Sequence, residues 1–371
     1  MILKVRQARP ESIIAVIGII VLLVFALAII PGSPVQQYLS GVRIKFRFTS
    51  GWPSDTRLSP DGKMVAISRP GMQGEFESVT SLLIFNVDTG SSVAELKADP
   101  RPMKFSPDGK FLATGFVDAE IRLWDTNTWQ MTAKFPIDIA DILCDMTYSP
   151  DSRFLLLAAC GGGHSGVQVI NVMSQQRVKQ LTKQGGGETA AAYSLDGQFI
   201  MTTYTPYVEG KDQDTTTVII WDSHTLEEVR RFELPESAIC LAWLPDNNSF
   251  TTVRSPYRNS LSSDTKDSTA KPVAVDFWDA TTGKKLRQID HSGPVLELSY
   301  SRDGRILAVG GTQSVDLWNT ATWQQISSFP TAKVRTLDFG RDNTSLAVID
   351  YAEYRGTATV YDISEMLKRS K

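Results

Sequence analysis

The chain has 371 residues, 42% of them hydrophobic, so it can bury a sizeable core. Its 38 lysines and arginines stand against 41 aspartates and glutamates, a formal net charge of −3. This balance leaves no basic surface stripe and argues against nucleic acid as a partner.

Residues 13–30 form the first predicted element. These eighteen residues, "IIAVIGIIVLLVFALAII", contain no charged or polar side chain. As an α-helix they would span about 27 Å, close to the thickness of a bilayer's hydrocarbon core. We therefore expect a transmembrane signal-anchor helix after a short head, residues 1–12. A cleaved signal peptide is the alternative, because Ala26 and Ala28 have the spacing of a cleavage site.

The basic residues of the head predict the orientation of this helix. Lys4, Arg6 and Arg9 all precede the apolar run, and positive charge flanking a span favours the cytoplasm. We expect a cytoplasmic N-terminus and place residues 31–371 on the non-cytoplasmic side, beginning with a linker at 31–42. Cleavage of the segment would instead give a secreted protein.

From residue 43 onward the chain repeats one unit. Each copy is marked by the aspartate of a Ser-Pro-Asp-Gly turn or of a degraded version of it, at intervals between 39 and 57 residues. These aspartates are Asp61, Asp108, Asp151, Asp196, Asp246, Asp303 and Asp342. A period in the forties is typical of a propeller, and Pro, Asp and Gly in this order predict a tight turn between antiparallel strands.

A second marker follows in every unit: a large apolar residue, most often aromatic, and then Asp or Asn. Its fullest forms are Trp124-Asp125, Trp221-Asp222, Trp278-Asp279 and Trp318-Asn319. In six units a large apolar residue stands ten positions after the Asp or Asn. Each unit is therefore expected to hold four strands, which we call a to d, with the marker pair at the end of strand c.

These motifs resemble those of the WD40-repeat β-propeller family, in a divergent, membrane-anchored and bacterial form. The resemblance covers residues 43–371 and implies an all-β, seven-bladed propeller. It implies structural roles for the turn aspartates and the tryptophans. The Gly-His dipeptide that usually opens a WD40 unit is absent, and only "DHSGPV" at 290–295 is similar to it. The family's buried histidine–aspartate network is therefore not assigned to any blade.

The seventh unit ends before its fourth strand. The segment "RIKFRF" at 43–48 can supply it, because Phe48 lies thirteen residues before Asp61, as Phe329 lies thirteen before Asp342. A strand from the N-terminal side would close the ring and remove two exposed sheet edges.

Insertions between strands b and c are the main candidates for function. They occupy residues 71–81, 204–216, 254–272 and 350–357, and all should lie on one face. Tyrosine and arginine in loops on a rigid scaffold suit a protein interface. The candidate contacts are Phe76, Tyr204, Tyr207, Arg254, Tyr257, Arg258, Tyr351 and Tyr354. Tolerated surface loops without a partner are the alternative.

Residues with catalytic or ligand chemistry are sparse. "GGHSGV" at 162–167 lacks the second glycine of a nucleophile elbow, and the three histidines have no metal-ligand spacing. Cys144, Cys160 and Cys240 lie in apolar strand-like runs, which predicts buried thiols. We expect no cofactor, no metal and no enzyme activity.

The sequence thus predicts a membrane-tethered, non-enzymatic scaffold that binds other, membrane-associated proteins through its loop-rich face. Because the linker should enter at the opposite face, the loop-rich face should point away from the membrane. A stabilising subunit of a membrane complex is one alternative. A small-molecule-binding or enzymatic propeller is another, and it would need polar groups that converge at the inner ends of the strands.

Overall fold

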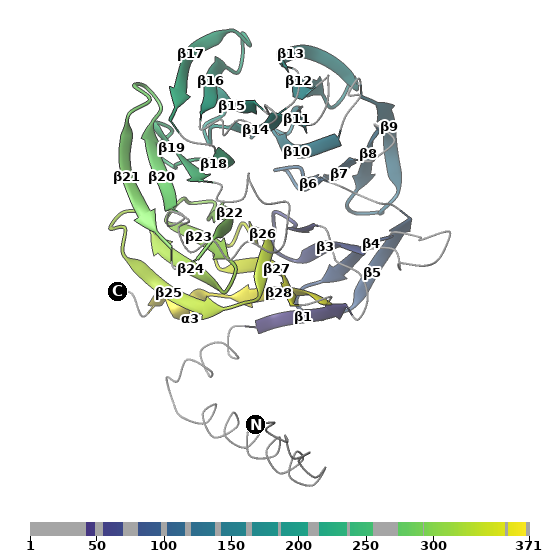
Figure 1. Ribbon diagram of the computed structural model, residues 1–371. Coiled ribbons are helices and arrows are strands. Elements are labelled where there is room, and N and C mark those ends of the chain that lie inside the picture. The colour runs from purple at the N-terminus through teal and green to yellow at the C-terminus, as the bar shows by residue number, and fades with distance from the viewer. Residues whose placement is uncertain are drawn as a thin grey trace, which may run out of the picture.

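Seven antiparallel sheets of four strands each surround a central axis in the computed structural model (Figure 1). This confirms the all-β, seven-bladed propeller. The structure describes residues 42–48, 55–69, 81–97, 102–115, 120–137, 142–160, 165–184, 187–206, 215–235, 238–254, 274–291, 293–352 and 355–368. The helix predicted at 13–30 lies outside these ranges, and no helix within them is long and apolar enough to cross a membrane.

The blades follow one another in chain order. Blade 1 holds β2 (Thr56–Leu58), β3 (Met64–Arg69), β4 (Ser81–Asn86) and β5 (Ser92–Lys97). Blade 2 holds β6 (Met103–Phe105), β7 (Phe111–Gly115), β8 (Glu120–Asp125) and β9 (Met131–Pro136). Blade 3 holds β10 (Ile142–Tyr148), β11 (Phe154–Cys160), β12 (Ser165–Asn171) and β13 (Gln176–Gln184). Blade 4 holds β14 (Gly187–Tyr193), β15 (Phe199–Pro206), β16 (Thr216–Asp222) and β17 (Glu228–Leu234).

The remaining blades complete the ring. Blade 5 holds β18 (Ala238–Trp243), β19 (Ser249–Arg254), β20 (Ala274–Asp279) and β21 (Lys285–Asp290). Blade 6 holds β22 (Val295–Tyr300), β23 (Ile306–Gly311), β24 (Ser314–Asn319) and β25 (Gln325–Pro330). Blade 7 holds β26 (Lys333–Phe339), β27 (Ser345–Ala352) and β28 (Arg355–Asp362), with β1 (Val42–Phe48) as its outer strand. A short helix, α3 (Ser364–Lys368), follows and buries Met366.

Strand β1 closes the ring. It pairs antiparallel with β28, with Val42 opposite Tyr361 and Phe48 opposite Gly356. The N-terminal strand and the last blade are therefore held together by backbone hydrogen bonds between segments more than 300 residues apart in the sequence. The closing strand occupies the outer edge of its sheet, as strand d does in every other blade (Figure 1).

Turn aspartates hold the hairpins between strands a and b. In blade 1, the Ser59 hydroxyl donates to Asp61 Oδ1 at 2.6 Å and the Lys63 N–H donates to the same oxygen at 3.1 Å. Gly62 then takes a φ of +71°, which a glycine adopts without a Cβ penalty. Blades 2, 3, 4 and 6 repeat the serine–aspartate bond.

The Asp or Asn of the second marker caps the turn between strands c and d. Asp125 Oδ1 accepts hydrogen bonds from the N–H groups of Asn127 and Thr128, both at 2.9 Å. The residue four positions after the marker Asp or Asn takes a positive φ in blades 1 to 6, and in blade 2 it is Trp129 at +55°. The Trp129 side chain is buried in the apolar cluster between blades 1 and 2, where it meets Phe105 of its own blade edge to face at 6.5 Å.

Three marker tryptophans also donate a buried hydrogen bond. The indole N–H of Trp124 reaches Thr114, that of Trp221 reaches Thr202 and that of Trp278 reaches Thr252, at 2.8 to 3.0 Å. In blade 6, Val309 stands at the position of these threonines. The Trp318 N–H accordingly has no hydrogen-bond partner among the described residues.

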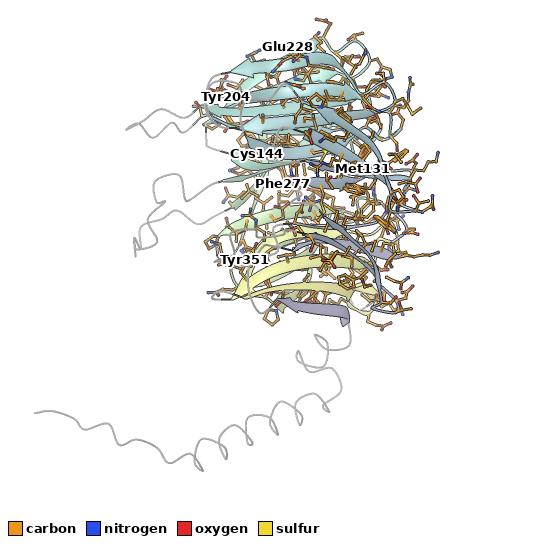
Figure 2. The ribbon with its side chains drawn as sticks, turned by 90° about the vertical axis from the view of Figure 1, so that its right-hand side faces the viewer. Met131, Cys144, Tyr204, Glu228, Phe277 and Tyr351 are labelled. Atoms are coloured by element: carbon orange, nitrogen blue, oxygen red, sulfur yellow. The ribbon has the colours of Figure 1, made fainter. Side chains whose placement is uncertain are left out.

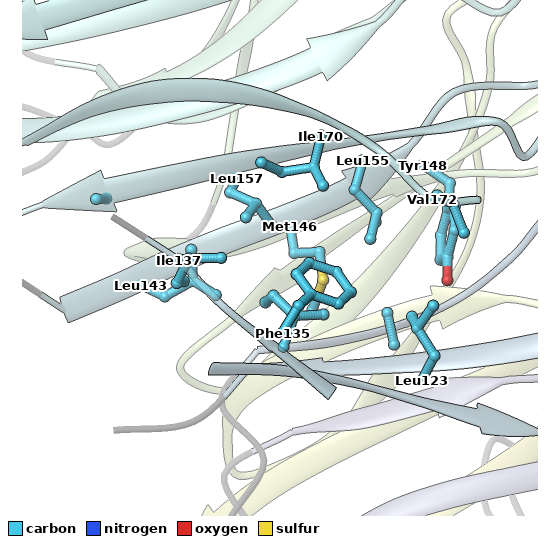
Figure 3. Packing of buried hydrophobic residues seen from close by; sticks show 13 residues of the cluster. Leu123, Phe135, Ile137, Leu143, Met146, Tyr148, Leu155, Leu157, Ile170 and Val172 are labelled. Atoms are coloured by element: carbon cyan, nitrogen blue, oxygen red, sulfur yellow. The ribbon is translucent and has the colours of Figure 1, made fainter. Parts of the chain in front are cut away.

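The core lies between blades rather than at the axis. Between blades 2 and 3, Phe135 packs against Met146 and Leu157 from the facing sheet (Figure 3). Phe135 is the apolar residue ten positions after Asp125, and the equivalent residues of blades 1, 3, 5 and 6 are also buried. Removing each such side chain from water contributes about 1.5 to 3 kcal/mol, so the repeated spacing supplies the force that joins neighbouring blades.

Candidate interaction surface

The two faces of the propeller carry different connections between strands. The turn face carries the a–b and c–d turns, and the loop face carries the b–c and d–a connections. Because Val42 pairs with Tyr361 at the end of β28, β1 begins at the turn face and ends at the loop face. In the side view, Tyr204, Cys144 and Tyr351 lie toward one side of the disc and Met131 toward the other (Figure 2).

Two of the predicted contact residues are described with their side chains. Tyr204 lies in β15, opposite Thr189 on one side and Thr217 on the other, and is half-buried. Tyr351 lies in β27, opposite Gly356, and packs its ring against the apolar cluster between blades 7 and 1. Both belong to strands rather than loops, because the ladders of blades 4 and 7 run further than the insertions suggested. They are therefore held in place by the sheet.

The other predicted contacts lie beyond what the structure describes. Arg254 is the last residue of β19, and its side chain is not part of the description. The remaining five are outside the described residues: Phe76, Tyr207, Tyr257, Arg258 and Tyr354. The structure thus brings Tyr204 and Tyr351 to one face from blades 4 and 7, on different parts of the ring.

Cys144 departs from its predicted state. It is exposed and disulfide-bonded, not a buried free thiol. The reason is a register shift in β10 between Leu143 and Asp145, which leaves Cys144 without a place in the ladder to β11. The apolar neighbours that suggested burial are themselves inside, as Leu143 is, while the extra residue of the bulge faces outward.

Charged residues also gather on the innermost strands, where sequence reasoning assigned none. The six are Asp55, Arg57, Lys104, Asp145, Glu297 and Asp338. They stand four or six residues before a turn aspartate, so a search for charge at these fixed offsets would have found them. Blades 1, 2, 3, 6 and 7 contribute to the cluster.

The buried members of this cluster connect neighbouring blades. Asp55, only 5% exposed, forms an ion pair with Arg57 at 2.8 Å and accepts the Met103 N–H of blade 2 at 3.1 Å. Asp338 of blade 7 accepts the Leu58 N–H at 2.7 Å. Burial raises the pKa of Asp55 despite the nearby Arg57 guanidinium. The Asp338 bond crosses the closure of the ring between blades 7 and 1, and the Asp55 bond joins blades 1 and 2, so both carboxylates have a structural task.

Glu297 is the member of the cluster with the most unusual chemistry. Burial among protein atoms raises its pKa to about 8; Arg57 opposes the rise, and Asp145 and Asp55 add to it. The carboxyl group therefore holds its proton at neutral pH. Among the described residues, no three histidine, cysteine, aspartate or glutamate side chains are arranged to hold a metal ion.

Blade 6 contains a histidine–aspartate pair that the sequence left unassigned. His291, in the connection before β22, places Nε2 3.2 Å from Asp316 Oδ2, and the Ser328 hydroxyl donates to Asp316 Oδ1 at 2.6 Å. Burial lowers the pKa of His291, but the Asp316 carboxylate and the Gly293 carbonyl outweigh it and the net pKa is raised. The pair is enclosed and fixes the d–a connection.

Comparison with known proteins matches two of the repeats directly. The family described as "WD domain, G-beta repeat" matches residues 98–125 and 283–319. WD repeat-containing protein SL1-17 of Schistosoma mansoni is 33% identical over 118 residues, 31% of this chain and 38% of that protein. WD repeat-containing protein 1 of Gallus gallus is 22% identical over 239 residues, 61% of this chain and 34% of that protein. The chain thus spans roughly a third of the length of these relatives.

A solved structure is similar over nearly the whole propeller. Hydrazine synthase of Kuenenia stuttgartiensis aligns with a TM-score of 0.67 and 14% identity, over 86% of this chain and 97% of that one. At this identity the likeness shows the fold alone. The repeat matches and the seven sheets together support a WD40-type β-propeller.

Proposed function

We propose that this protein is a membrane-tethered, non-enzymatic scaffold that binds another protein through its loop face. The observation that carries the proposal is the placement of Tyr204 and Tyr351. Both are amphipathic, half-buried and held in β-strands, and both lie at the face where the longest insertions begin. Fixed aromatic side chains lose little conformational entropy on binding, which favours them as interface anchors.

The site supports binding better than catalysis. The charged cluster at the inner strands would be the natural place for a ligand, but Asp55 and Asp338 accept backbone N–H groups of neighbouring blades. The relatives named above are described as WD repeat proteins, and the likeness to hydrazine synthase carries no activity to this chain.

The disulfide at Cys144 supports placing the propeller on the non-cytoplasmic side. Disulfides persist in oxidising compartments and are rare in the cytosol. This agrees with the orientation expected from Lys4, Arg6 and Arg9, and the apolar run at 13–30 would be the tether. Since β1 starts at the turn face, the loop face would then point away from the membrane.

A pull-down after crosslinking in native membranes tests the proposal. We would compare the wild type with a variant whose residues 258–271 are replaced by a short Gly-Ser linker, and with a Met131→Ser control on the turn face. We expect one partner to disappear with the loop and to remain in the control. Retention of every partner in the loop variant would argue against this insertion as a contact. A partner that never exchanges with added, labelled protein would indicate a permanent subunit of a complex.

A further inference from the structure

A crevice lies between blades 5 and 6. It has a volume of about 410 Å³, and we call it the blade 5/6 crevice. Its walls come from strands c and d of blade 5, the a–b turn of blade 5 and the c–d turn of blade 6. The lining residues used below are Leu244, Pro245, Phe277, Leu286, Arg287 and Trp323.

Two aromatic rings form the apolar part of the crevice. Trp323 meets Phe277 edge to face, with ring centroids 4.4 Å apart and planes at 73°. Leu286, on β21, is 54% exposed at the rim. Phe277 is only 1% exposed, so it supports the half-buried Trp323 ring from behind. A large apolar side chain entering here would cover Leu286 and contact Trp323, which removes apolar surface of both partners from water.

Arg287 supplies the crevice with a cation that forms no ion pair with a described acid. Its guanidinium carbon lies 5.0 Å above the Trp323 ring centroid, which holds the group in place. Within the part of the chain that the structure describes, no hydrogen bond or ion pair engages this guanidinium. The nearby Asp246 carboxylate is occupied by its own turn, since Oδ1 accepts the N–H groups of Asn248 and Ser249 at 2.8 and 2.9 Å.

At the junction between blades 3 and 4, the equivalent cation has an acidic partner within the chain. There Lys179, the counterpart of Arg287, donates to the Leu226 carbonyl at 2.6 Å and to Glu227 Oε1 at 2.8 Å. Counting from the marker residues Asp222 and Asn319, the residue of blade 6 that corresponds to Glu227 is Gln324. The fold thus brings a cation to the same turn in both places, but blade 6 offers it a neutral amide.

We propose that the blade 5/6 crevice binds a peptide segment of a partner protein in which a large apolar side chain is followed directly by a carboxylate. The Trp323 ring, supported by Phe277, and Leu286 would receive the apolar side chain. The Arg287 guanidinium would receive the carboxylate through charge-assisted hydrogen bonds, in the role that Glu227 fills within the chain for Lys179. This site is separate from the loop face and does not depend on the function proposed above.

Two matched peptides test the site: Ac-Gly-Phe-Glu-Gly-NH2 and its Gln counterpart, which differ only in the charge. They would be titrated into the full-length chain, solubilised in mild detergent and labelled with 5-fluorotryptophan, while ¹⁹F resonances of its eight tryptophans are followed. Trp323→Phe assigns the signal at the crevice. We expect the Glu peptide to shift this signal and to bind about tenfold more tightly than the Gln peptide.

Variants separate specific binding from general charge attraction. Arg287→Gln should abolish the preference for the Glu peptide, and Leu286→Ser should weaken both peptides alike. Arg230→Gln is the matched control, because Arg230 holds the same position in blade 4 but lies near the Asp279 carboxylate. It should change nothing. Equal binding of the two peptides, an equal loss with Arg230→Gln, or no shift of the Trp323 signal would overturn the proposal.

Discussion

Position, more than residue type, decides what an acidic side chain does in this protein. Asp125 and its equivalents accept the N–H groups of a tight turn, and hydrogen bonds from the Thr128 N–H and hydroxyl lower the pKa of Asp125. Asp55, directly before the innermost strand β2, has its pKa raised by burial and accepts an N–H from the next blade. The same chemical group therefore terminates a strand in one place and joins two blades in another.

Glu297 predicts a pH dependence of stability. Its pKa rises from an ordinary 4.5 to about 8 in the folded chain. Between these values the folded state binds more protons than the unfolded state, so the free energy of unfolding falls as the pH rises. Because the carboxyl is half-buried, we expect a loss on the order of 2 kcal/mol across this window.

Glu297→Gln should remove this loss. Chemical denaturation at pH 5 and pH 9 would show the variant gaining on the wild type at the higher pH and matching it more closely at the lower. Parallel stability profiles of wild type and variant would contradict the raised pKa. Asp246→Asn, in a turn of blade 5, controls for removal of an acid elsewhere.

The Cys144 disulfide predicts sensitivity to reductant. A native disulfide stabilises by about 2 to 4 kcal/mol, chiefly by restricting the unfolded chain. We expect dithiothreitol to lower the free energy of unfolding of the wild type by this amount, which shifts its urea midpoint to lower concentration. Cys144→Ser should start at the lower midpoint and not respond to reductant. A wild type that keeps its midpoint under reducing conditions would count against the disulfide.

At the scale of the element, the c–d turns combine backbone strain with packing. Trp129 takes a φ of +55°, a conformation that costs a bulky residue about 1 to 2 kcal/mol. Its ring is buried among the apolar residues between blades 1 and 2. Gln175 takes a φ of +59° at the same turn position in blade 3, but its side chain is exposed and buries nothing.

This pair gives a prediction of opposite signs. Gln175→Gly should stabilise the protein by about 0.5 to 1 kcal/mol, because glycine adopts the conformation without strain. Trp129→Gly should destabilise it by about 2 to 4 kcal/mol, because the lost burial outweighs the relief. Thermal unfolding of both variants measures the difference, and a gain in stability from Trp129→Gly would show that packing does not balance the strain.

At the scale of the whole molecule, the sequence was sufficient for the architecture because the markers that build each blade are local. The turn aspartates fix the hairpins, and the ten-residue interval from Asp125 to Phe135 places a buried side chain between sheets. Such spacings are visible in a single chain. The number of blades and the closing position of β1 follow from them.

Features that depend on contacts between distant segments were not predictable in this way. Cys144 was expected to be buried, but a bulge in β10 turns it outward and a disulfide engages it. The cluster of Asp55, Glu297 and Asp338 forms only when blades 6, 7 and 1 become neighbours. That no described residue pairs with the Arg287 guanidinium depends on which turn of the next blade faces it, where Gln324 stands at the position of Glu227.

The proposed scaffold function rests on one claim: the loop face, rather than the turn face, meets the partner. Placing the photo-crosslinking residue p-benzoylphenylalanine at Tyr204, Tyr351 and, as control, Met131 tests it in native membranes. The account predicts that one protein is captured from both Tyr204 and Tyr351, which belong to blades 4 and 7, and not from Met131 on the turn face. Capture from Met131 alone, or from neither tyrosine, would contradict it.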